Sequence, residues 1–411
     1  MKPREVLPGV WWVGVLHPEL RLFDDLFATE NGTSYNAYLL KTAQPTLIDT
    51  VKGKFTAELL ANLESQTDLA GLKYIVANHA EPDHSGALGR LLERAPNATV
   101  LGSKAVGLFL KELLNRDFPF RAVADGETLD LGGLTLSFVI APFLHWPDTI
   151  FTYVPELRAA FTCDALGAHF CPRGELWAEG NPDYRSDQKL YYDCLIRLYG
   201  EHVRRALDKV RDVPIETVLP SHGPLLRGEC LATTLARYRE WSAAPARGAK
   251  RLVGIVYLSS HGNTEQMARA VAQGVEAAGA AAELAHWSEK SEEEMVSLYE
   301  RADALVFGTP TINRDVPPPM WRALALLSVA ALPARRVAGC FGSFGWSGEA
   351  AKLVESRLAG IGYQLPVESV RARFAPTDPD LAKCRELGRS LAAAGLPPGG
   401  NTAPASAGQG H

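Results

Sequence analysis

The stretch Asn78-His79-Ala80-Glu81-Pro82-Asp83-His84-Ser85-Gly86 places four side chains that can bind a metal ion within six consecutive positions. The run before it, Tyr74-Ile75-Val76-Ala77, is apolar and typical of a buried strand, and a helical spacing of leucines begins at Leu88. We therefore expect the potential ligands to lie on a loop at the carboxyl end of a strand, where sites in α/β proteins commonly form.

The spacing within this loop indicates more than one metal position. His79 and Glu81 alternate, so an extended backbone directs both side chains the same way, whereas Asp83 and His84 follow on the turn and can reach a second centre. Further candidates, each at the end of an apolar run, follow downstream: His145, Asp164 and His222. So many ligand-type residues at strand ends favour a metal site over scattered surface polar groups.

Length and composition indicate a globular protein with two cores. A chain of 411 residues is too long for one ordinary core. The net charge of −5 argues against binding to nucleic acid or anionic lipid. No apolar run reaches transmembrane length, and the first residues do not resemble a signal peptide. The six cysteines contain no CxxC pair, which favours a cytoplasmic location and argues against a fused iron–sulfur or rubredoxin-type module.

The first part of the chain mixes strand pairs with helices, which predicts two packed sheets flanked by helices. We expect strands at residues 9–15, 35–40, 46–50, 126–133 and 134–140, and helices at residues 55–63 and up to 114. One long helix is predicted over residues 187–210, because apolar side chains recur along it at helical spacing.

The second part alternates strand and helix regularly. A small, polar stretch at residues 242–250 is the best domain boundary, so we predict domains at 1–248 and 249–396 and a disordered tail at 397–411. Strands are expected at residues 252–258, 281–285, 304–308, 337–341 and near Val367, with a helix at 265–278. This order predicts a doubly wound α/β domain with a five-stranded parallel sheet.

Three loops of this second domain predict a flavin site. Ser259-Ser260-His261-Gly262-Asn263-Thr264 joins the first strand to its helix and can cradle a phosphate without a lysine. It matches neither GxxxxGK[ST] nor GxGxxG, which disfavours a nucleoside triphosphate or a dinucleotide. On the same sheet edge, the next strands end in Thr309-Pro310-Thr311-Ile312-Asn313 and in Gly342-Ser343-Phe344-Gly345-Trp346-Ser347-Gly348. Phe344 and Trp346 can enclose a flat ring, and a phosphate joined to a flat ring indicates FMN.

Together these motifs resemble the flavodiiron proteins, or A-type flavoproteins, in which a metallo-β-lactamase-like domain precedes a flavodoxin-like domain. The resemblance covers about residues 9–396 and rests on HxExDH at 79–84 and on the flavodoxin loops. It also rests on Phe161-Thr162-Cys163-Asp164-Ala165-Leu166-Gly167, Ser221-His222-Gly223-Pro224 and Thr33-Ser34-Tyr35-Asn36-Ala37-Tyr38-Leu39. His261 departs from the threonine of many flavodoxins, but a backbone cradle should tolerate it. The resemblance implies an αββα sandwich for the first domain.

The metal ligands predict iron rather than zinc. Zinc hydrolases of this fold use HxHxDH, and Glu81 here replaces the middle histidine with a harder, anionic ligand. The expected arrangement is His79, Glu81 and His145 on one iron, Asp83, His84 and His222 on the other, with Asp164 bridging both. His84 could instead turn away and leave water in its place. His169 is expected to hydrogen-bond near the site rather than to bind metal.

The resemblance implies an oxidoreductase that reduces O2 to water, NO to N2O, or both. FMN would pass electrons from an external donor, such as rubredoxin or a flavin reductase, to the diiron site. It also implies a head-to-tail homodimer, or a dimer of such dimers, in which FMN of one chain faces the iron of the other near Trp346 and Glu81. The alternatives are an electron-transfer flavoprotein and a metal-dependent hydrolase that carries a flavodoxin domain.

Overall fold

The computed structural model describes residues 2–244, 248–332 and 336–394, and the chain divides into two compact units, Met1–Ala244 and Pro245–His411. The tail predicted to be disordered, 397–411, lies outside the described residues. The boundary predicted between residues 248 and 249 stays a prediction. Within the described ranges, no helix is long and apolar enough to cross a membrane.

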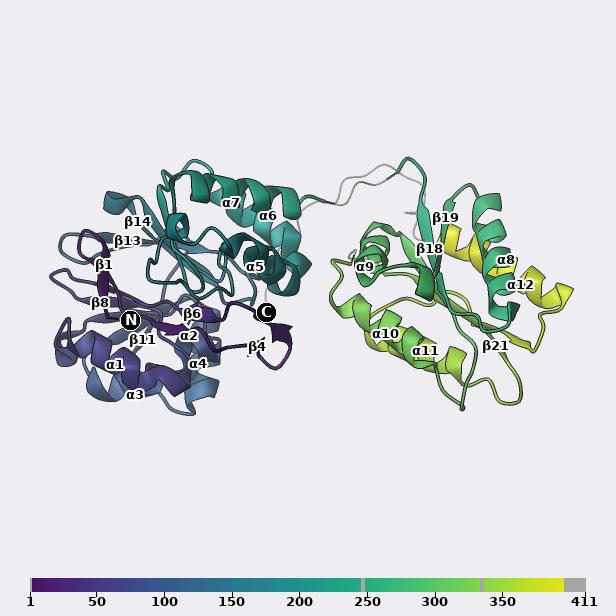
Figure 1. Ribbon diagram of the computed structural model, residues 1–411, viewed down its shortest axis with the longest axis horizontal. Coiled ribbons are helices and arrows are strands. Elements are labelled where there is room, and N and C mark those ends of the chain that lie inside the picture. The colour runs from purple at the N-terminus through teal and green to yellow at the C-terminus, as the bar shows by residue number, and fades with distance from the viewer. Residues whose placement is uncertain (1, 245–247, 333–335, 395–411) are drawn as a thin grey trace. The chain divides into compact units, whose positions relative to one another are not determined.

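Two sheets form the first unit (Figure 1). In spatial order, the first sheet contains β1 (Arg4–Leu7), β2 (Val10–Trp12), β7 (Tyr38–Leu40), β8 (Thr46–Ile48), β9 (Tyr74–Val76), β10 (Thr99–Gly102) and β11 (Phe120–Ala122). The second contains β12 (Thr128–Asp130), β13 (Thr135–Ile140), β14 (Ile150–Val154), β15 (Ala159–Cys163), β16 (Thr217–Pro220) and β17 (Leu226–Arg227). Short pairs add β3 (Val15–His17) with β6 (Thr33–Tyr35) and β4 (Leu22–Phe23) with β5 (Phe27–Ala28).

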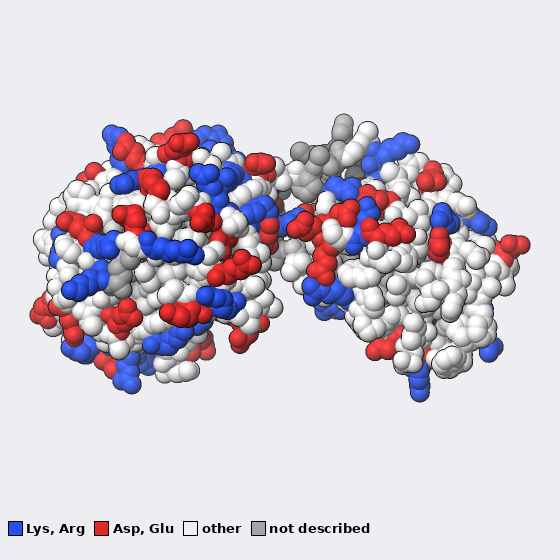
Figure 2. Space-filling view, in the orientation of Figure 1, with Lys and Arg blue, Asp and Glu red and all other residues white. Residues whose placement is uncertain are grey.

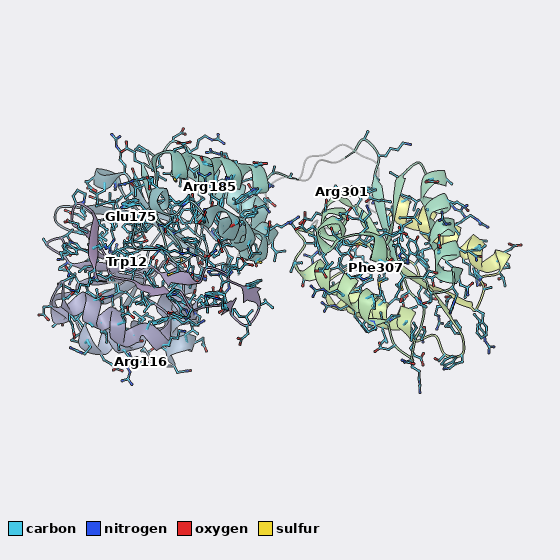
Figure 3. All side chains as sticks on the ribbon, in the orientation of Figure 1. Trp12, Arg116, Glu175, Arg185, Arg301 and Phe307 are labelled. Atoms are coloured by element: carbon cyan, nitrogen blue, oxygen red, sulfur yellow. The ribbon has the colours of Figure 1, made fainter. Side chains whose placement is uncertain are left out.

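Helices cover the outer faces of both sheets. Along the first sheet lie α1 (Thr56–Glu64), α3 (Leu88–Arg94) and α4 (Lys104–Leu114), and along the second lie α5 (Tyr184–Tyr191), α6 (Gly200–Lys209) and α7 (Gly228–Trp241), while the short helix α2 (Pro82–Ser85) follows β9. Alternation along β7 separates two cores, because Leu39 packs among the residues of α1 and α3 while Tyr38 and Leu40 face the second sheet. Trp12 lies in the core between the sheets (Figure 3). The predicted αββα sandwich is confirmed.

The single helix predicted over residues 187–210 is wrong. The chain instead forms α5, a π-helical turn (Tyr192–Ile196), a 3₁₀ turn (Arg197–Tyr199) and α6. The extra residue of the π turn lets the neighbours Tyr191 and Tyr192 both be buried, one against Asp164 and the other against Tyr238. Leu190, one of the apolar side chains whose spacing predicted the single helix, is 45% exposed. A regular helical period could not reveal this shift.

The second unit is the predicted doubly wound domain. Its described sheet is parallel, in the order β19 (Ala281–His286), β18 (Leu252–Tyr257), β20 (Ala304–Gly308), β21 (Ala338–Phe344) and β22 (Val370–Arg373). Helices α8 (Asn263–Ala277) and α12 (Asp378–Ala393) cover one face, and α9 (Glu292–Arg301), α10 (Pro318–Ala325) and α11 (Ala350–Gly360) cover the other (Figure 1). Phe307 on β20 is fully buried in this unit (Figure 3). The last strand begins three residues after the predicted Val367.

Candidate metal centre and flavin site

The predicted metal-binding side chains follow strands from both sheets of the first unit. His79 and Glu81 come after β9, and Pro82 starts the short helix α2 that carries Asp83 and His84. The second sheet supplies the other members: His145 between β13 and β14, Asp164 after β15 and His222 after β16. Strand β15 ends at Cys163 with a φ of 53°, an uncommon backbone conformation directly before Asp164. The fold therefore brings together residues far apart in sequence.

The two carboxylate oxygens of Asp164 face different pairs of histidines. Oδ2 lies 3.7 Å from Nε2 of His79 and 3.8 Å from Nε2 of His145. Oδ1 lies 3.1 Å from Nε2 of His84 and 3.5 Å from Nε2 of His222. A carboxylate placed in this way has one oxygen available to each of two metal positions.

Glu81 and Asp83 add one carboxylate to each side. Glu81 Oε2 lies 3.2 Å from His79 Nε2 and 3.0 Å from His145 Nε2. Asp83 Oδ2 lies 3.0 Å from His222 Nε2, and Asp83 Oδ1 lies 3.3 Å from His84 Nε2. Metal–ligand bonds of about 2.1 Å at angles of about 90–110° separate ligand atoms by about 3.0–3.4 Å. The side chains are therefore spaced as metal ligands require.

Two buried polar atoms further favour a bound cation. Asp83 Oδ1 and His84 Nε2 are buried and make no hydrogen bond with any described residue. Two groups of potential ligand atoms lie within 4.8 Å of one another: His79, Glu81, His84 and Asp164, and Asp83, His84 and His222. His84 belongs to both groups, and His145 belongs to neither but contacts Glu81. Imidazole and carboxylate donors fit a pair of non-haem irons.

The pKa shifts give the same picture of a site that needs positive charge. Burial alone would lower the pKa of His79, but hydrogen bonds with Asp148 and Glu81 outweigh it and raise this pKa to about 10. Burial would raise the pKa of Glu81, yet hydrogen bonds from His145 and His79 lower it to about 2. Burial would also lower the pKa of His84, but the carboxylates of Asp164 and Asp83 hold it well above its usual value. Without metal, protons on His79 and His84 supply positive charge that a metal would otherwise supply.

The sequence did not reveal the groups that orient these ligands. The fully buried Asp148 accepts hydrogen bonds from His79 Nδ1 at 2.9 Å and from Ala80 N at 2.8 Å. His222 Nδ1 lies 2.7 Å from the backbone oxygen of Ser34. Such contacts at the second ring nitrogen fix the tautomer and orientation of a ligating histidine. An aspartate between two apolar strands, three residues after His145, was the signal available in the sequence.

Tyr191 contacts the metal cluster from α5. Its hydroxyl donates a 2.9 Å hydrogen bond to Asp164 Oδ1, the oxygen that faces His84. His169, expected near the site, lies 3.1 Å from Thr33 Oγ1 through its Nδ1, and its ring centroid is 4.7 Å from that of Tyr191. His169 belongs to neither group of potential ligands among the described residues.

The predicted flavin loops meet at one edge of the parallel sheet. The hydroxyl of Thr264, at the start of α8, lies 3.0 Å from Ser343 Oγ. The backbone N–H of Thr311 donates to the Ser343 backbone oxygen at 3.1 Å. Gly262 has a φ of 80° and would have open space around a Cβ atom. This backbone leaves the amino end of α8 accessible for a phosphate, whose charge the helix dipole favours.

The outer part of this site is exposed. Trp346 is 79% exposed and Ile312 is 44% exposed, each on one of the predicted loops. Phe374, which the sequence did not suggest, is 61% exposed, and its backbone N–H donates to the Phe344 oxygen at 2.8 Å. Two exposed aromatic side chains, Trp346 and Phe374, thus lie in neighbouring segments after β21 and β22, an arrangement that fits the flat ring of FMN.

Comparisons with known proteins agree with the two-domain architecture. Family models match the chain as an ODP family beta lactamase at residues 33–223 and as a flavodoxin at residues 255–388. The flavo-diiron protein FprA2 of Clostridium acetobutylicum is 38% identical over 395 residues, which cover 94% of this chain and 98% of that protein. The chain belongs to the flavodiiron protein family.

Other flavodiiron relatives are also similar along most of their length. The nitric oxide reductase of Moorella thermoacetica is 33% identical to this chain, and the aligned region covers 95% of this chain and 98% of that protein. The crystal structure of the rubredoxin oxygen:oxidoreductase of Desulfovibrio gigas aligns with a TM-score of 0.66 and 28% identity, over 96% of this chain and 98% of that one. This flavodiiron protein is therefore an oxidoreductase whose cofactors are FMN and a non-haem diiron site.

Proposed function

We propose that this flavodiiron protein reduces O2 to water, NO to N2O, or both. The observation that carries the proposal is the position of Asp164, whose two oxygens face separate histidine pairs, as a carboxylate between two irons requires. A nitric oxide reductase and a rubredoxin oxygen:oxidoreductase are among the relatives, which supports both substrates. When bound, two ferrous ions and reduced FMN supply four electrons in total. Reduction of O2 to water uses all four, whereas coupling of two NO molecules to N2O uses two.

The proposed ligands are His79, Glu81 and His145 for one iron and Asp83, His84 and His222 for the other, with Asp164 bridging. The side chains of Glu81 and His145 are 13% exposed, whereas those of the other ligands are at most 4% exposed. The open side of the centre therefore lies beside Glu81 and His145. Asp148 and Ser34 hold His79 and His222 in the tautomer that leaves Nε2 free for metal.

The flavin is proposed to bind across the three loops of the second unit. Ser259, Ser260, His261, Gly262, Asn263 and Thr264 would hold its phosphate, and the ring would contact residues from Thr309, Pro310, Thr311, Ile312, Asn313, Ser343, Phe344, Gly345, Trp346, Ser347 and Gly348. The parallel sheet fixes the loops, because each begins at the carboxyl end of a strand.

The proposed partners are O2 or NO, an external electron donor such as rubredoxin or a flavin reductase, and a second copy of the chain. Lys and Arg alternate with Asp and Glu on the face of the first unit seen in Figure 2, a distribution that suits small neutral substrates better than nucleic acid. All six cysteines are free thiols, which supports a reducing compartment and hence a cytoplasmic location.

The test of the proposed activity is gas consumption by the fully reduced protein, with O2 and NO presented separately. Iron and FMN content are measured on the same sample. Fast loss of either gas supports the reductase and identifies its preferred substrate. Loss of neither gas from a sample with full iron and FMN would overturn the proposal in favour of an electron-transfer flavoprotein, and zinc in place of iron would favour a hydrolase.

The head-to-tail homodimer is tested by mixing two inactive variants. His79→Ala removes an iron ligand, and a triple variant with Ser259→Asp, Ser260→Asp and Asn263→Asp places three carboxylates in the phosphate loop so that FMN is lost. If FMN of one chain serves the iron of its partner, exchange of subunits pairs an intact flavin site with an intact diiron site and restores gas reduction. A mixture that exchanges subunits but stays inactive would contradict this arrangement.

A further inference from the structure

A cavity of about 170 Å³ lies in the first unit between α6, α7 and the six-stranded sheet. Its walls are largely aliphatic and aromatic, with Val203 and Leu207 from α6, Leu235 from α7, and Phe151 and Val218 from the sheet. These side chains belong to the core that packs the two helices on the sheet. None of them is among the proposed iron ligands.

The polar groups that line this cavity are already satisfied. Thr162 Oγ1 donates to the backbone oxygen of Ala165 at 2.7 Å, and the Tyr238 hydroxyl accepts from Leu166 N at 3.1 Å. Arg211 and Arg239 also border the cavity, but both are exposed, so their charges remain in solvent. The lining is mainly apolar, whereas an ordered buried water needs two to four polar partners. The interior of the cavity is therefore apolar and favours dry contents.

On two separate loops, a residue that lines the cavity is next in the sequence to a proposed iron ligand. Leu144 lines it and directly precedes His145, and Ala165 lines it and directly follows Asp164. Leu144 is 2% exposed and Ala165 is 4% exposed, so buried side chains line the cavity on this side. At its other end, the partly exposed Val213 lies near the surface. The cavity is thus lined both by buried sequence neighbours of two proposed iron ligands and by a residue near the protein surface.

We propose that this cavity binds the dissolved diatomic gas and delivers it to the diiron centre, an inference that rests on the proposed gas reduction. A dry cavity of about 150 Å³ with a similar apolar lining binds small apolar molecules and xenon. O2 and NO are small and nearly apolar, so they partition from water into such a space. Ions and protons are excluded from it and reach the centre at its open side, beside Glu81 and His145.

Xenon is the probe for gas binding, because it needs no turnover. The holoprotein is titrated with xenon and followed by ¹²⁹Xe NMR, beside the variant Ala206→Phe, which adds a ring to a buried α6 residue on the cavity wall. The control, Ala236→Phe, adds the same ring to an exposed residue of α7. Saturable xenon binding is expected in the wild type and the control and is lost in Ala206→Phe. Absence of saturable binding in the wild type would overturn the proposal.

Steady-state kinetics test whether the cavity delivers gas to the diiron centre. In Ala206→Phe we expect the KM for the preferred gas to rise about threefold or more, with kcat at saturating gas and the rate of FMN reduction unchanged. Ala206→Leu fills less of the cavity and should give an intermediate KM if the larger ring prevents folding. An unchanged KM in a folded variant that no longer binds xenon would overturn delivery. A wild type that binds xenon but consumes neither gas would instead overturn the proposed function.

Discussion

The metal cluster and the flavin loops are built in opposite ways. The metal cluster uses side chains from both sheets of the first unit, and His79, Asp164 and His222 are nearly or fully buried. The flavin loops lie at the edge of one sheet, and Ser260, His261 and Trp346 are exposed. In the cluster, function depends on the chemical identity of each side chain. In the loops, we expect it to depend more on where the backbone places its N–H groups.

This difference arises from the ligand that each site must bind. A metal ion needs charged or basic atoms at fixed distances, and buried groups of this kind are costly unless they are paired. A phosphate is satisfied by backbone N–H groups, which every residue except proline provides. Substitutions should therefore have large effects in the cluster and small effects in the loops, and four predictions test this contrast.

The largest effect is expected from removing a proposed ligand. His79→Ala and Asp164→Ala should each lower gas reduction by more than about a hundredfold, since even partners of metal ligands are worth about 10–100-fold. FMN should stay bound and reducible, because the flavin loops belong to the other unit. The measurement is gas consumption with iron content, beside the control His202→Ala on α6. Full turnover in either variant would contradict the ligand assignment.

Asp148→Asn should have the next largest effect. Asparagine removes the negative charge and replaces one of the two oxygens that face His79 Nδ1 with an NH2 group, so the acceptor behind this ring is weakened. We expect iron affinity to fall by about 10–100-fold. The measurement is competition with a chelator, with Asp212→Asn, an exposed aspartate, as the control. An unchanged iron affinity would show that His79 binds metal without a carboxylate acceptor at Nδ1.

Iron binding should release protons, and affinity should depend on pH by about tenfold per unit for each proton. The pKa of His79 is raised to about 10 in the metal-free protein, so at pH 7 its ring is protonated and must lose that proton to bind metal. Affinity therefore rises as pH increases towards this pKa. Calorimetry in two buffers of different ionisation enthalpy measures the release, and pH-independent affinity between pH 6 and 8 would contradict it.

The smallest effect is expected in the flavin loops. Asn263→Asp adds a negative charge near the proposed phosphate, and a pair of charges about 4 Å apart in water costs about 1 kcal/mol, or fivefold in FMN affinity. His261→Thr should leave the affinity nearly unchanged, because it alters a side chain and not the backbone cradle. Fluorescence titration with FMN measures both. A larger loss for His261→Thr than for Asn263→Asp would reverse the contrast between the two sites.

The sequence predicted most of the fold and both cofactors, because each signal was local. The apolar run before His79 predicted β9, and the strand predicted at residues 304–308 is β20. The break in the helix predicted over 187–210 was missed, because hydrophobic spacing alone does not distinguish an α turn from a π turn. Phe374 was missed as well, since an exposed aromatic residue beside the flavin loops has no sequence signature.

The sequence by itself determined which chemistry this protein has: a set of histidines and carboxylates at strand ends, and loops suited to a phosphate and a flat ring. Only the tertiary structure decided how these parts cooperate. It directed the two oxygens of Asp164 to different histidine pairs, placed Asp148 behind His79, and left an apolar cavity beside Leu144. The physical reason is that ligand chemistry belongs to single residues, whereas distance, burial and enclosed volume arise only when distant segments pack together.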